Sequence, residues 1–343
     1  MSTRKAPDKN LFFSKTWPFL NEFLIGQSGR SPATVESYRD SLTIFKIYLV
    51  GELSRSIADF QFSDCTKECI YNFREYLLRT GSQPSTVNVR VAAIRSYLKY
   101  VADTDISVQS VALAVSQITP CKKIQKEKEI LSEQALSAIL AAPPSTKIGV
   151  RDRAILVLLY DTAVRISELL GIRLCDISLD NPYPSIFITG KGNKERTIQL
   201  SEQSSSHLRE YIRVFHRASA KDDYMFFTTI KGVTGRMSSG NVQRLIKKYA
   251  AQTRDLGFDI PQSVHPHMFR RTRATNLYQE GVAIELVSTV LGHARTDTTR
   301  NYYAKPSVEQ IRKALESVPT PAGDEEPLWV GSEEEMARLC GLR

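Results

Sequence analysis

The stretch SIFITGKGNKERTIQL, residues 185–200, decides the fold class of this chain. Apolar and polar residues alternate in SIFIT and again in RTIQL, which is typical of short strands with one buried face. The GKGNKE segment between them holds two glycines and three charged residues, a composition typical of a tight turn. We therefore predict a β-hairpin here, in a chain whose other segments have a helical period.

Four amphipathic segments on the N-terminal side predict an all-helical domain over residues 13–104. They are SKTWPFLNEFLIGQ, SPATVESYRDSLTIFKIYLVGEL, CTKECIYNFREYLLRTG and QPSTVNVRVAAIRSYLKYV. In the second segment, Ser31 is the expected N-cap and Pro32 the first helical residue. Residues 1–12 are expected to be a flexible N-terminus. Residues 105–129 are predicted to be a basic linker because CKKIQKEKE is rich in lysine.

A second domain is predicted over residues 130–318, followed by an acidic tail over residues 319–343. The domain begins with the helix LSEQALSAILAA, and a single buried helix is expected around RDRAILVLLYDTAVRISELLGI. After the hairpin the pattern is helical to about Val318. A short helix with one apolar stripe is expected after Ser332. The predicted fold class is therefore mainly α with a small antiparallel β-sheet.

The charge distribution favours a polyanionic partner. The chain has 46 lysines and arginines against 37 aspartates and glutamates, a formal net charge of +9. The tail from Asp324 to Arg343 has six acidic and two basic residues, a balance of −4, so the rest of the chain carries +13. Nucleic acid is the first expectation and an anionic membrane the second. A merely basic soluble protein is an equally open alternative on charge alone.

Neither metal chemistry nor membrane insertion is predicted. The five cysteines are scattered without a disulfide framework or a zinc-ligand pattern, and the histidines lack metal-ligand spacing. We expect no metal, no cofactor, and reduced cysteines in a cytoplasmic protein. The start MSTRKAPDKN is polar, and the apolar run AILVLLY from Ala154 is too short to span a bilayer.

Basic residues lie beside apolar neighbours in TAVRISELLG (162–171), TGKGNKER (189–196), HPHMFRRTRAT (265–275) and LGHARTDTTRNYY (291–303). Arg165 is expected inside a buried helix, where a guanidinium is costly unless it is paired. An ion pair with Glu168, three residues later, would satisfy it without any catalytic role. His267 and Arg270 are three apart on a predicted helix and share one face, whereas Arg271 points elsewhere.

Together these residues suit the stabilisation of a phosphoryl transition state without a metal. Guanidinium groups hold two non-bridging oxygens at once, and preorganised donors are usually the largest catalytic contribution. A tyrosine oxygen can attack phosphorus and form a covalent intermediate, and a lysine or histidine can protonate the leaving alkoxide. The groups in question are Arg165, Lys191, His267, Arg270, His293 and the pair Tyr302 and Tyr303.

At these positions the chain resembles the tyrosine recombinase (phage-type integrase) family, from residue 13 to about residue 318. Each motif is weak alone, but six in family order are specific. They are Arg165 (first box), Glu168 (the acidic residue three later), Lys191 (hairpin lysine), the pair His267 and Arg270 (second box), Leu291-Gly292-His293 (LGH) and Tyr302, nine residues after His293 (nucleophile).

Two positions depart from the family pattern. Arg271 stands where the family often has histidine, which we expect to be a tolerated variation, with a phosphate contact as one role. Tyr303 directly follows Tyr302, and neighbouring residues of a helix point in different directions, so only one can face the phosphate. The spacing from His293 favours Tyr302, and Tyr303 is the alternative nucleophile.

The resemblance implies a SAM-like core-binding domain and an α+β catalytic domain that hold duplex DNA as a C-shaped clamp. Tyr302 would form a 3′-phosphotyrosyl link, with Lys191 as general acid to the 5′-oxygen, His267 assisting proton transfer and Arg270 holding a non-bridging oxygen. Four protomers would assemble on two double-stranded recombination sites, with accessory proteins as further partners. The short segment before the first domain favours a Xer-type, transposon or plasmid enzyme without an arm-binding domain.

Residues outside these motifs are predicted to contact DNA. The segment TGRMSSGNVQRLIKKYA suggests a helix whose polar side chains suit major-groove edges and phosphates, with a solvated basic face as the alternative. The fourth helix of the first domain is expected to add phosphate contacts. The residues are Lys194, Arg236, Asn241, Gln243, Arg244 and Lys247 in the second domain and Arg90, Arg95 and Lys99 in the first.

Two other functions stay open at this point. A DNA-binding regulator without catalysis would explain the charge, but not the ordered cationic residues with a tyrosine. A type IB topoisomerase shares the chemistry but relaxes DNA without joining partners. Integration or excision of a mobile element and dimer resolution are equally open, as is whether the tail docks onto a neighbouring protomer or only solubilises the chain.

Overall fold

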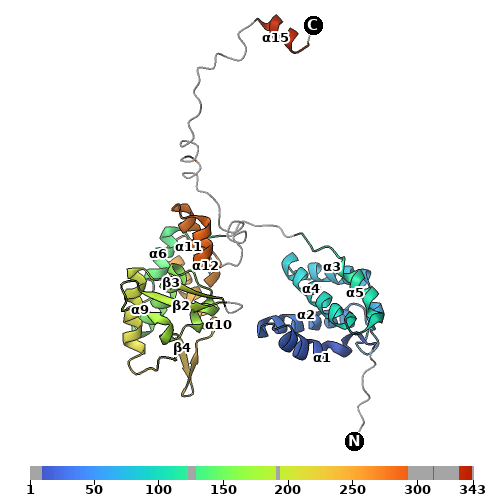
Figure 1. Cartoon of the computed structure of the whole chain (residues 1–343), viewed down its shortest axis with the longest axis horizontal. Helices are drawn as coiled ribbons and strands as arrows, with labels where there is room; N and C mark the ends of the chain where they lie inside the picture. The colour runs from blue at the N-terminus through green and yellow to red at the C-terminus, as the bar shows by residue number, and fades with distance from the viewer. Residues whose placement is uncertain (1–9, 123–128, 191–193, 293–311, 313–331, 342–343) are drawn as a thin grey trace. The chain divides into compact units, whose positions relative to one another are not determined.

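The computed structural model describes residues 10–122, 129–190, 194–292, 312 and 332–341. Their fold is mostly helical with small antiparallel sheets, as predicted. The chain divides into two compact units, Met1–Glu127 and Lys128–Arg343 (Figure 1).

The first unit is built from helices throughout its described part (Figure 1). Ser31 caps α2 as predicted, because its side-chain oxygen accepts the Thr34 N–H, and proline occupies the first helical position. The segments in chain order are η1 (Phe12–Lys15), α1 (Thr16–Pro18), η2 (Phe19–Gln27), α2 (Pro32–Gly51), η3 (Phe62–Asp64), α3 (Lys67–Arg79), α4 (Pro84–Ala102), η4 (Ile106–Val108) and α5 (Gln109–Ser116).

The core of the first unit is rich in aromatic side chains. The ring of Phe12 lies edge-on to those of Phe45, Phe60 and Tyr97, with centroid distances of 5.4, 5.6 and 5.2 Å. Aromatic rings prefer such tilted contacts because their positive edges meet negative faces. The stretch before α1 is therefore fastened to α2 and α4.

The first unit extends beyond residue 104, where the linker was expected to begin. Val115 of α5 is fully buried in its core. The Asn88 side chain donates to the Cys121 carbonyl at 3.0 Å and accepts the Cys121 N–H at 2.8 Å. The expected linker over residues 105–129 is thus too long at its N-terminal side, since Val108 and Val115 are buried in the core of the first unit before the lysine-rich stretch begins.

The second unit joins helices to two antiparallel sheets (Figure 1). Its elements are α6 (Glu133–Ala141), α7 (Lys147–Asp161), α8 (Ile166–Gly171), η5 (Leu174–Asp176), β1 (Ile177–Ser178), β2 (Ser185–Thr189), β3 (Glu195–Gln199), α9 (Glu202–Phe215), β4 (Phe227–Ile230), β5 (Val233–Arg236), α10 (Ser239–Asp255), α11 (Pro266–Gln279), α12 (Ile284–Leu291) and α15 (Glu333–Leu339).

The predicted hairpin is confirmed as β2 and β3. The strands pair antiparallel, with Ile186 opposite Ile198 and Ile188 opposite Arg196. The three isoleucines are buried against the helices of the unit. Alternation therefore places one face of the hairpin in the core, and the short strand β1 extends the sheet beside β2.

The single buried helix expected around residues 151–172 is wrong. It is broken between α7, which ends at Asp161, and α8, which begins at Ile166. Ala163 in the break has a left-handed φ of 49°, which is uncommon for a residue with a Cβ. No glycine or proline marks the break, and the apolar period continues across it, so the sequence pattern gives no sign of it.

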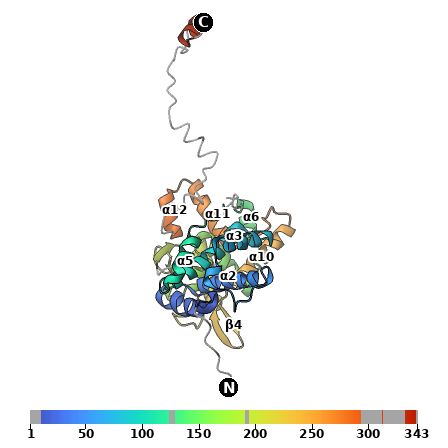
Figure 2. The same cartoon turned by 90° about the vertical axis from the view of Figure 1, so that its right-hand side faces the viewer.

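The expectation of purely helical structure after the first hairpin is also wrong. β4 and β5 form a second hairpin, which extends away from the rest of its unit (Figures 1 and 2). Lys231 and Gly232 at its tip have φ values of 50° and 80°, as a type I′ turn requires. The sequence signal for this hairpin was the β-branched residues that flank Lys-Gly. It was missed because the strands are largely exposed and lack apolar alternation.

The acidic tail contains α15, the short helix predicted after Ser332. Its apolar residues Met336 and Leu339 are exposed. Among the described residues, no helix has both the length and the apolar character that crossing a bilayer demands.

Candidate functional site

Arg165 lies at the N-cap of α8, directly after the break that follows α7. Its backbone N–H donates to Glu168 Oε2 at 3.0 Å, and its guanidinium donates to Glu168 Oε1 at 2.7 Å. The ion pair that the sequence suggested is present. The Arg165 side chain is still 36% exposed, whereas that of Glu168 is 3% exposed. The ion pair therefore orients the Arg165 side chain and leaves it partly exposed to solvent.

A second arginine, Arg196 on β3, reaches the same carboxylate and was missed in the sequence analysis. Its Nη2 donates to Glu168 Oε2 at 2.9 Å, and its side chain is 13% exposed. The sequence did contain a signal that Arg196 points inward, because strand residues two apart share a face and Ile198 faces the core. Two arginines from different elements thus share one buried carboxylate.

The Glu168 carboxyl remains charged because of these arginines. Burial alone would raise its pKa, but the hydrogen bonds from Arg196 and Arg165 outweigh burial and lower the pKa below its ordinary value. A buried carboxylate with such partners is a rigid anchor, since any rotation would leave its charge unpaired. Glu168 thus determines where both guanidiniums lie.

Arg270 on α11 is fully buried and joins three segments of the second unit. Its Nη1 donates to the Ala163 carbonyl at 2.5 Å, and its Nη2 donates to the Leu291 carbonyl at 2.6 Å. The first contact lies two residues before Arg165, and the second lies at the end of α12. His267, three residues before Arg270 on the same helix, is exposed. The structure thus brings Arg165 and Arg270 to one turn.

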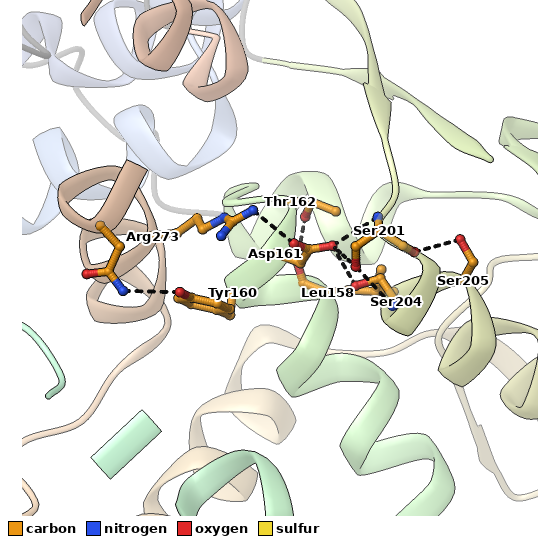
Figure 3. A network of polar contacts seen from close by, with 9 residues as sticks. Leu158, Tyr160, Asp161, Thr162, Ser201, Ser204, Ser205 and Arg273 are labelled. Carbon is orange, nitrogen blue, oxygen red and sulfur yellow. Dashed lines mark hydrogen bonds and ion pairs between the residues drawn. The ribbon is translucent and has the colours of Figure 1, made fainter. Parts of the chain in front are cut away.

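Asp161, the last residue of α7, binds side chains from two other segments of the second unit (Figure 3). Its Oδ2 accepts the hydroxyls of Ser201 and Ser204 at 2.7 Å each, and its Oδ1 accepts Arg273 at 3.2 Å. The Arg273 guanidinium also lies over the Tyr160 ring, 5.3 Å from its centroid. The end of α7 is therefore tied to α9 and to α11, which carries the second-box residues. Asp161 was not singled out from the sequence.

The N-terminus of α11 is capped by His265. Its Nδ1 accepts the Met268 N–H at 3.2 Å, so this nitrogen carries no proton in the capped state. Burial and then the nearby Arg271 lower the His265 pKa. Arg271 itself is buried and donates to the Glu129 carbonyl at 2.7 Å. The arginine at this departure from the family pattern thus ties α11 to the start of its domain.

Acidification should weaken this cap. Because the folded-state pKa of His265 is lowered, the stability it contributes is present above the unfolded pKa near about 6.5 and is lost as pH falls toward the folded pKa. We expect the second unit to lose about 1 kcal/mol of unfolding free energy, the value of an N-cap. The measurement is thermal unfolding between about pH 7.5 and about pH 5.

His265→Asn is the matched variant, since asparagine caps helices well and does not titrate in this range. Its unfolding midpoint should change less with pH than that of the wild type. Equal pH dependence in the two proteins would contradict the assignment of this titration to His265.

Four predicted site residues, Lys191, His293, Tyr302 and Tyr303, lie outside the described residues. Directly after β2, the Gly190 N–H donates to the Lys194 carbonyl at 2.8 Å. Lys194 is exposed. In the described residues, no group of histidine, cysteine or acidic side chains has the arrangement of a metal site.

The predicted DNA-reading helix is α10, which Ser238 caps through the Asn241 N–H. Its buried face is apolar, and its other face carries the exposed side chains of Gln243, Arg244, Lys247 and Lys248. Arg236, at the end of β5, is exposed and donates to the Ser167 carbonyl at 2.7 Å. A basic exposed face on α10 is consistent with DNA contact and with solvation alike.

The three predicted contacts of the first unit have different surroundings. Arg90 donates to Ser82 Oγ at 2.9 Å. Arg95 donates to the carbonyls of Val115, at 3.1 Å, and Ile118, so its guanidinium binds α5 and the chain after it. Lys99 is exposed. Arg95 therefore has an internal bonding role that competes with a phosphate contact.

Comparisons with known proteins show which family the chain belongs to. Residues 129–309 match the phage integrase family, and residues 19–104 match the phage integrase N-terminal SAM-like domain. The chain belongs to the phage integrase family. Tyrosine recombinase XerC of Myxococcus xanthus is 31% identical to this recombinase over 311 residues, which cover 88% of this chain and 97% of the relative. Tyrosine recombinase XerC of Staphylococcus haemolyticus is 29% identical over 298 residues, which cover 86% and 93%. The chain is a tyrosine site-specific recombinase, as the order of its motifs indicated.

Solved structures confirm the recombinase fold. XerH recombinase bound to a palindromic difH substrate matches with a TM-score of 0.65 and 21% identity, over 86% of this chain and 83% of that chain. The Tn1549 transposon integrase in complex with transposon right end DNA matches with a TM-score of 0.65 and 16% identity, over 88% and 99%. The shared fold includes the helical first unit that the resemblance implied.

Proposed function

We propose that this recombinase cleaves and rejoins double-stranded DNA with Arg165, Lys191, His267, Arg270 and His293 around the scissile phosphate and Tyr302 as nucleophile. The observation that supports this most is the turn at residues 162–165. Arg270 binds its Ala163 carbonyl while Glu168 orients Arg165 at its end. Two arginines from distant parts of the sequence therefore meet at one turn, as two guanidiniums on one phosphate require.

The reaction conserves the phosphodiester bond energy. The Tyr302 hydroxyl oxygen attacks phosphorus and loses its proton to a base, for which His267 is our candidate. The bond to the 5′-oxygen breaks, and Lys191 donates the proton that this leaving group needs. The 5′-hydroxyl of a partner strand then attacks the 3′-phosphotyrosyl link and releases the tyrosine. Since one ester replaces another, ATP is not required.

Charge neutralisation is the main contribution of the arginines. Negative charge builds on the non-bridging oxygens in the transition state, and fixed guanidinium donors stabilise it by roughly 3 kcal/mol each. The buried ion pair at Glu168 and the two carbonyl bonds of Arg270 hold these donors before DNA arrives. Preorganisation therefore replaces the metal ion that many phosphoryl-transfer enzymes use.

We further propose a homo-tetramer on two DNA sites, with each protomer holding its site as a C-shaped clamp of two domains. The exposed basic face of α10 supports a groove contact, and α15 supports docking onto a neighbouring protomer through Met336 and Leu339. Accessory proteins would then choose the partner site. The reaction takes place in the cytoplasm, where such a DNA substrate lies.

Two biological roles fit this activity. The relatives named XerC support resolution of DNA dimers, and the likeness to a transposon integrase supports movement of a mobile element. We favour the Xer-type role because the sequence matches reach about 30% identity along most of the chain, whereas the integrase likeness is one of fold. A type IB topoisomerase would use similar chemistry without joining two sites, but the family match and the XerC relatives make this chain a recombinase.

A recombination assay separates these functions. A duplex site is first selected from a randomised library by its binding to the Tyr302→Phe protein. Two copies are then placed on one supercoiled plasmid. A recombinase yields two smaller circles or an inverted segment, and only when both sites are present. Relaxation of a plasmid without the site, with no new junctions, would instead identify a topoisomerase, and binding without cleavage would identify a regulator.

A further inference from the structure

Arg196 shares its carboxylate with the proposed catalytic Arg165. The Arg196 guanidinium binds Glu168 Oε2, and the Arg165 guanidinium binds Glu168 Oε1. Arg196 is on β3 and Arg165 is at the start of α8, so the carboxylate fastens the hairpin to the turn. A change at Arg196 would therefore be transmitted to Arg165.

Two glycines lie close to the Arg196–Glu168 pair. A Cβ added at Gly292 would lie 2.8 Å from Arg196 Nη1 and 3.0 Å from its Nε, and Gly292 has a left-handed φ of 63°. A Cβ added at Gly190 would lie 3.1 Å from Glu168 Oε1 and 3.5 Å from Arg196 Nη1. At position 292 the left-handed φ and the contacts with Arg196 both favour glycine. At position 190 a Cβ would fit only if a neighbouring atom moved by a few tenths of an ångström.

The sequence positions of these glycines matter for the reaction. Gly190 directly precedes Lys191, and Gly292 directly precedes His293. One ion pair therefore contacts the backbone beside two proposed catalytic residues and also orients Arg165. These three groups come from segments more than 20 residues apart in the sequence, so their mutual placement needs such a shared contact.

We propose that Arg196 is a positioning residue of the cleavage reaction, which holds Glu168 and hence Arg165 in place and sets the backbone at Gly190 and Gly292. This inference rests on the proposed function, because it assigns Arg196 to the same site. Arg196 need not touch DNA in this role. It acts by keeping the groups that do so aligned, and a misplacement of about 1 Å can cost on the order of 100-fold in rate.

Loss of Arg196 should make the site sensitive to acid. Glu168 Oε2 would keep only the Arg165 backbone N–H, while the carboxyl stays buried. Among the described residues, the charged groups that bond to this carboxyl are Arg165 and Arg196, so the variant would keep Arg165 alone of these two. Burial would then favour the protonated form, and a neutral Glu168 would hold Arg165 more weakly.

The test compares Arg196→Met and Arg196→Lys with Arg153→Met in the full-length protein. Arg153 is a half-buried arginine of α7 that donates to the Pro143 carbonyl, so its variant controls for truncating such a side chain. The probe is the selected duplex carrying a nick beside the cleavage position, which traps the covalent complex. Site affinity and single-turnover cleavage rate are measured across pH, with thermal unfolding as a check on folding.

We expect Arg196→Met to bind the site within about twofold of wild type but to cleave roughly 10–100-fold more slowly. Its rate should begin to fall at a higher pH than that of the wild type, because the buried carboxyl has lost one of its two guanidinium partners. Arg196→Lys, which keeps one charged donor, should recover much of the rate. Adding Glu168→Gln to Arg196→Met should remove this additional loss of cleavage rate at low pH, because no carboxyl remains at position 168 to titrate.

Two results would overturn the inference. One is an Arg196→Met protein with the rate and pH profile of Arg153→Met. The other is a loss of rate that is equal at every pH and is not relieved by lysine, since that pattern describes a purely structural residue. A wild-type protein that forms no covalent complex would refute the proposed function and this inference with it. If the wild type cleaves the site, the proposed function stands and the Arg196 variants test this inference alone.

Discussion

Tyr302→Phe should form no covalent complex with the nicked duplex site, while it binds that site as tightly as the wild type. The substitution removes only the phenolic oxygen that is proposed to attack phosphorus, and phenylalanine keeps the ring. The measurement is a denaturing gel without added metal, on which the wild type gives a shifted protein–DNA band. This is the largest effect we expect, because without a nucleophile no covalent product can form.

Tyr303→Phe is the matched control, since it makes the same change one residue later. The adjacent tyrosines point roughly 100° apart if they lie on a helix, so only one can face the phosphate. The Tyr303→Phe protein should retain the covalent band. Loss of the band in this variant alone would keep the family but show that Tyr303 is the nucleophile.

Arg270→Lys should lower the single-turnover cleavage rate by roughly 100- to 1,000-fold, the value of one lost transition-state donor. Lysine keeps the charge but offers a point donor instead of a planar fork. It cannot hold the Ala163 and Leu291 carbonyls and a phosphate oxygen with the same geometry. One buried carbonyl without its partner should also lower the unfolding free energy by about 1–3 kcal/mol.

Arg271→Lys separates catalysis from stability in this experiment. Arg271 is the next residue of α11, is also buried, and binds a backbone carbonyl at Glu129. Its lysine variant should lose stability to a similar extent but keep most of the cleavage rate. If both variants slow cleavage equally, Arg270 acts only by holding α11 in place, and its proposed contact with the phosphate is wrong.

Local patterns were sufficient for much of this structure. The alternation in SIFIT and RTIQL predicted β2 and β3, because a hairpin with one buried face imposes a period of two. Ser31 with Pro32 predicted the start of α2, because the unpaired N–H groups of a first turn need a nearby oxygen. These signals depend on neighbours in the chain, so a reading of the sequence can find them.

The errors arose where distant residues decide the conformation. The helix break at Ala163 is stabilised by Arg270, more than 100 residues later, which donates to the Ala163 carbonyl. It is also stabilised by Glu168, which binds the Arg165 N–H and the Arg196 guanidinium. No local pattern encodes such a contact. The β4–β5 hairpin was missed for a different reason, since its strands are exposed and lack the apolar period that marks a buried face.

The family, the reaction class and the identity of the main catalytic candidates were apparent from residues 165, 191, 267, 270, 293 and 302 in order, since chemistry limits which side chains can serve a phosphate. The residues that hold these candidates in place were not apparent from the sequence. Arg196, Asp161 and His265 gain their roles from a buried carboxylate, a shared ion pair and a helix cap that exist once the chain is folded. A charge costs little in water and much when buried, so partners become necessary where packing removes water, and packing is a property of the folded chain.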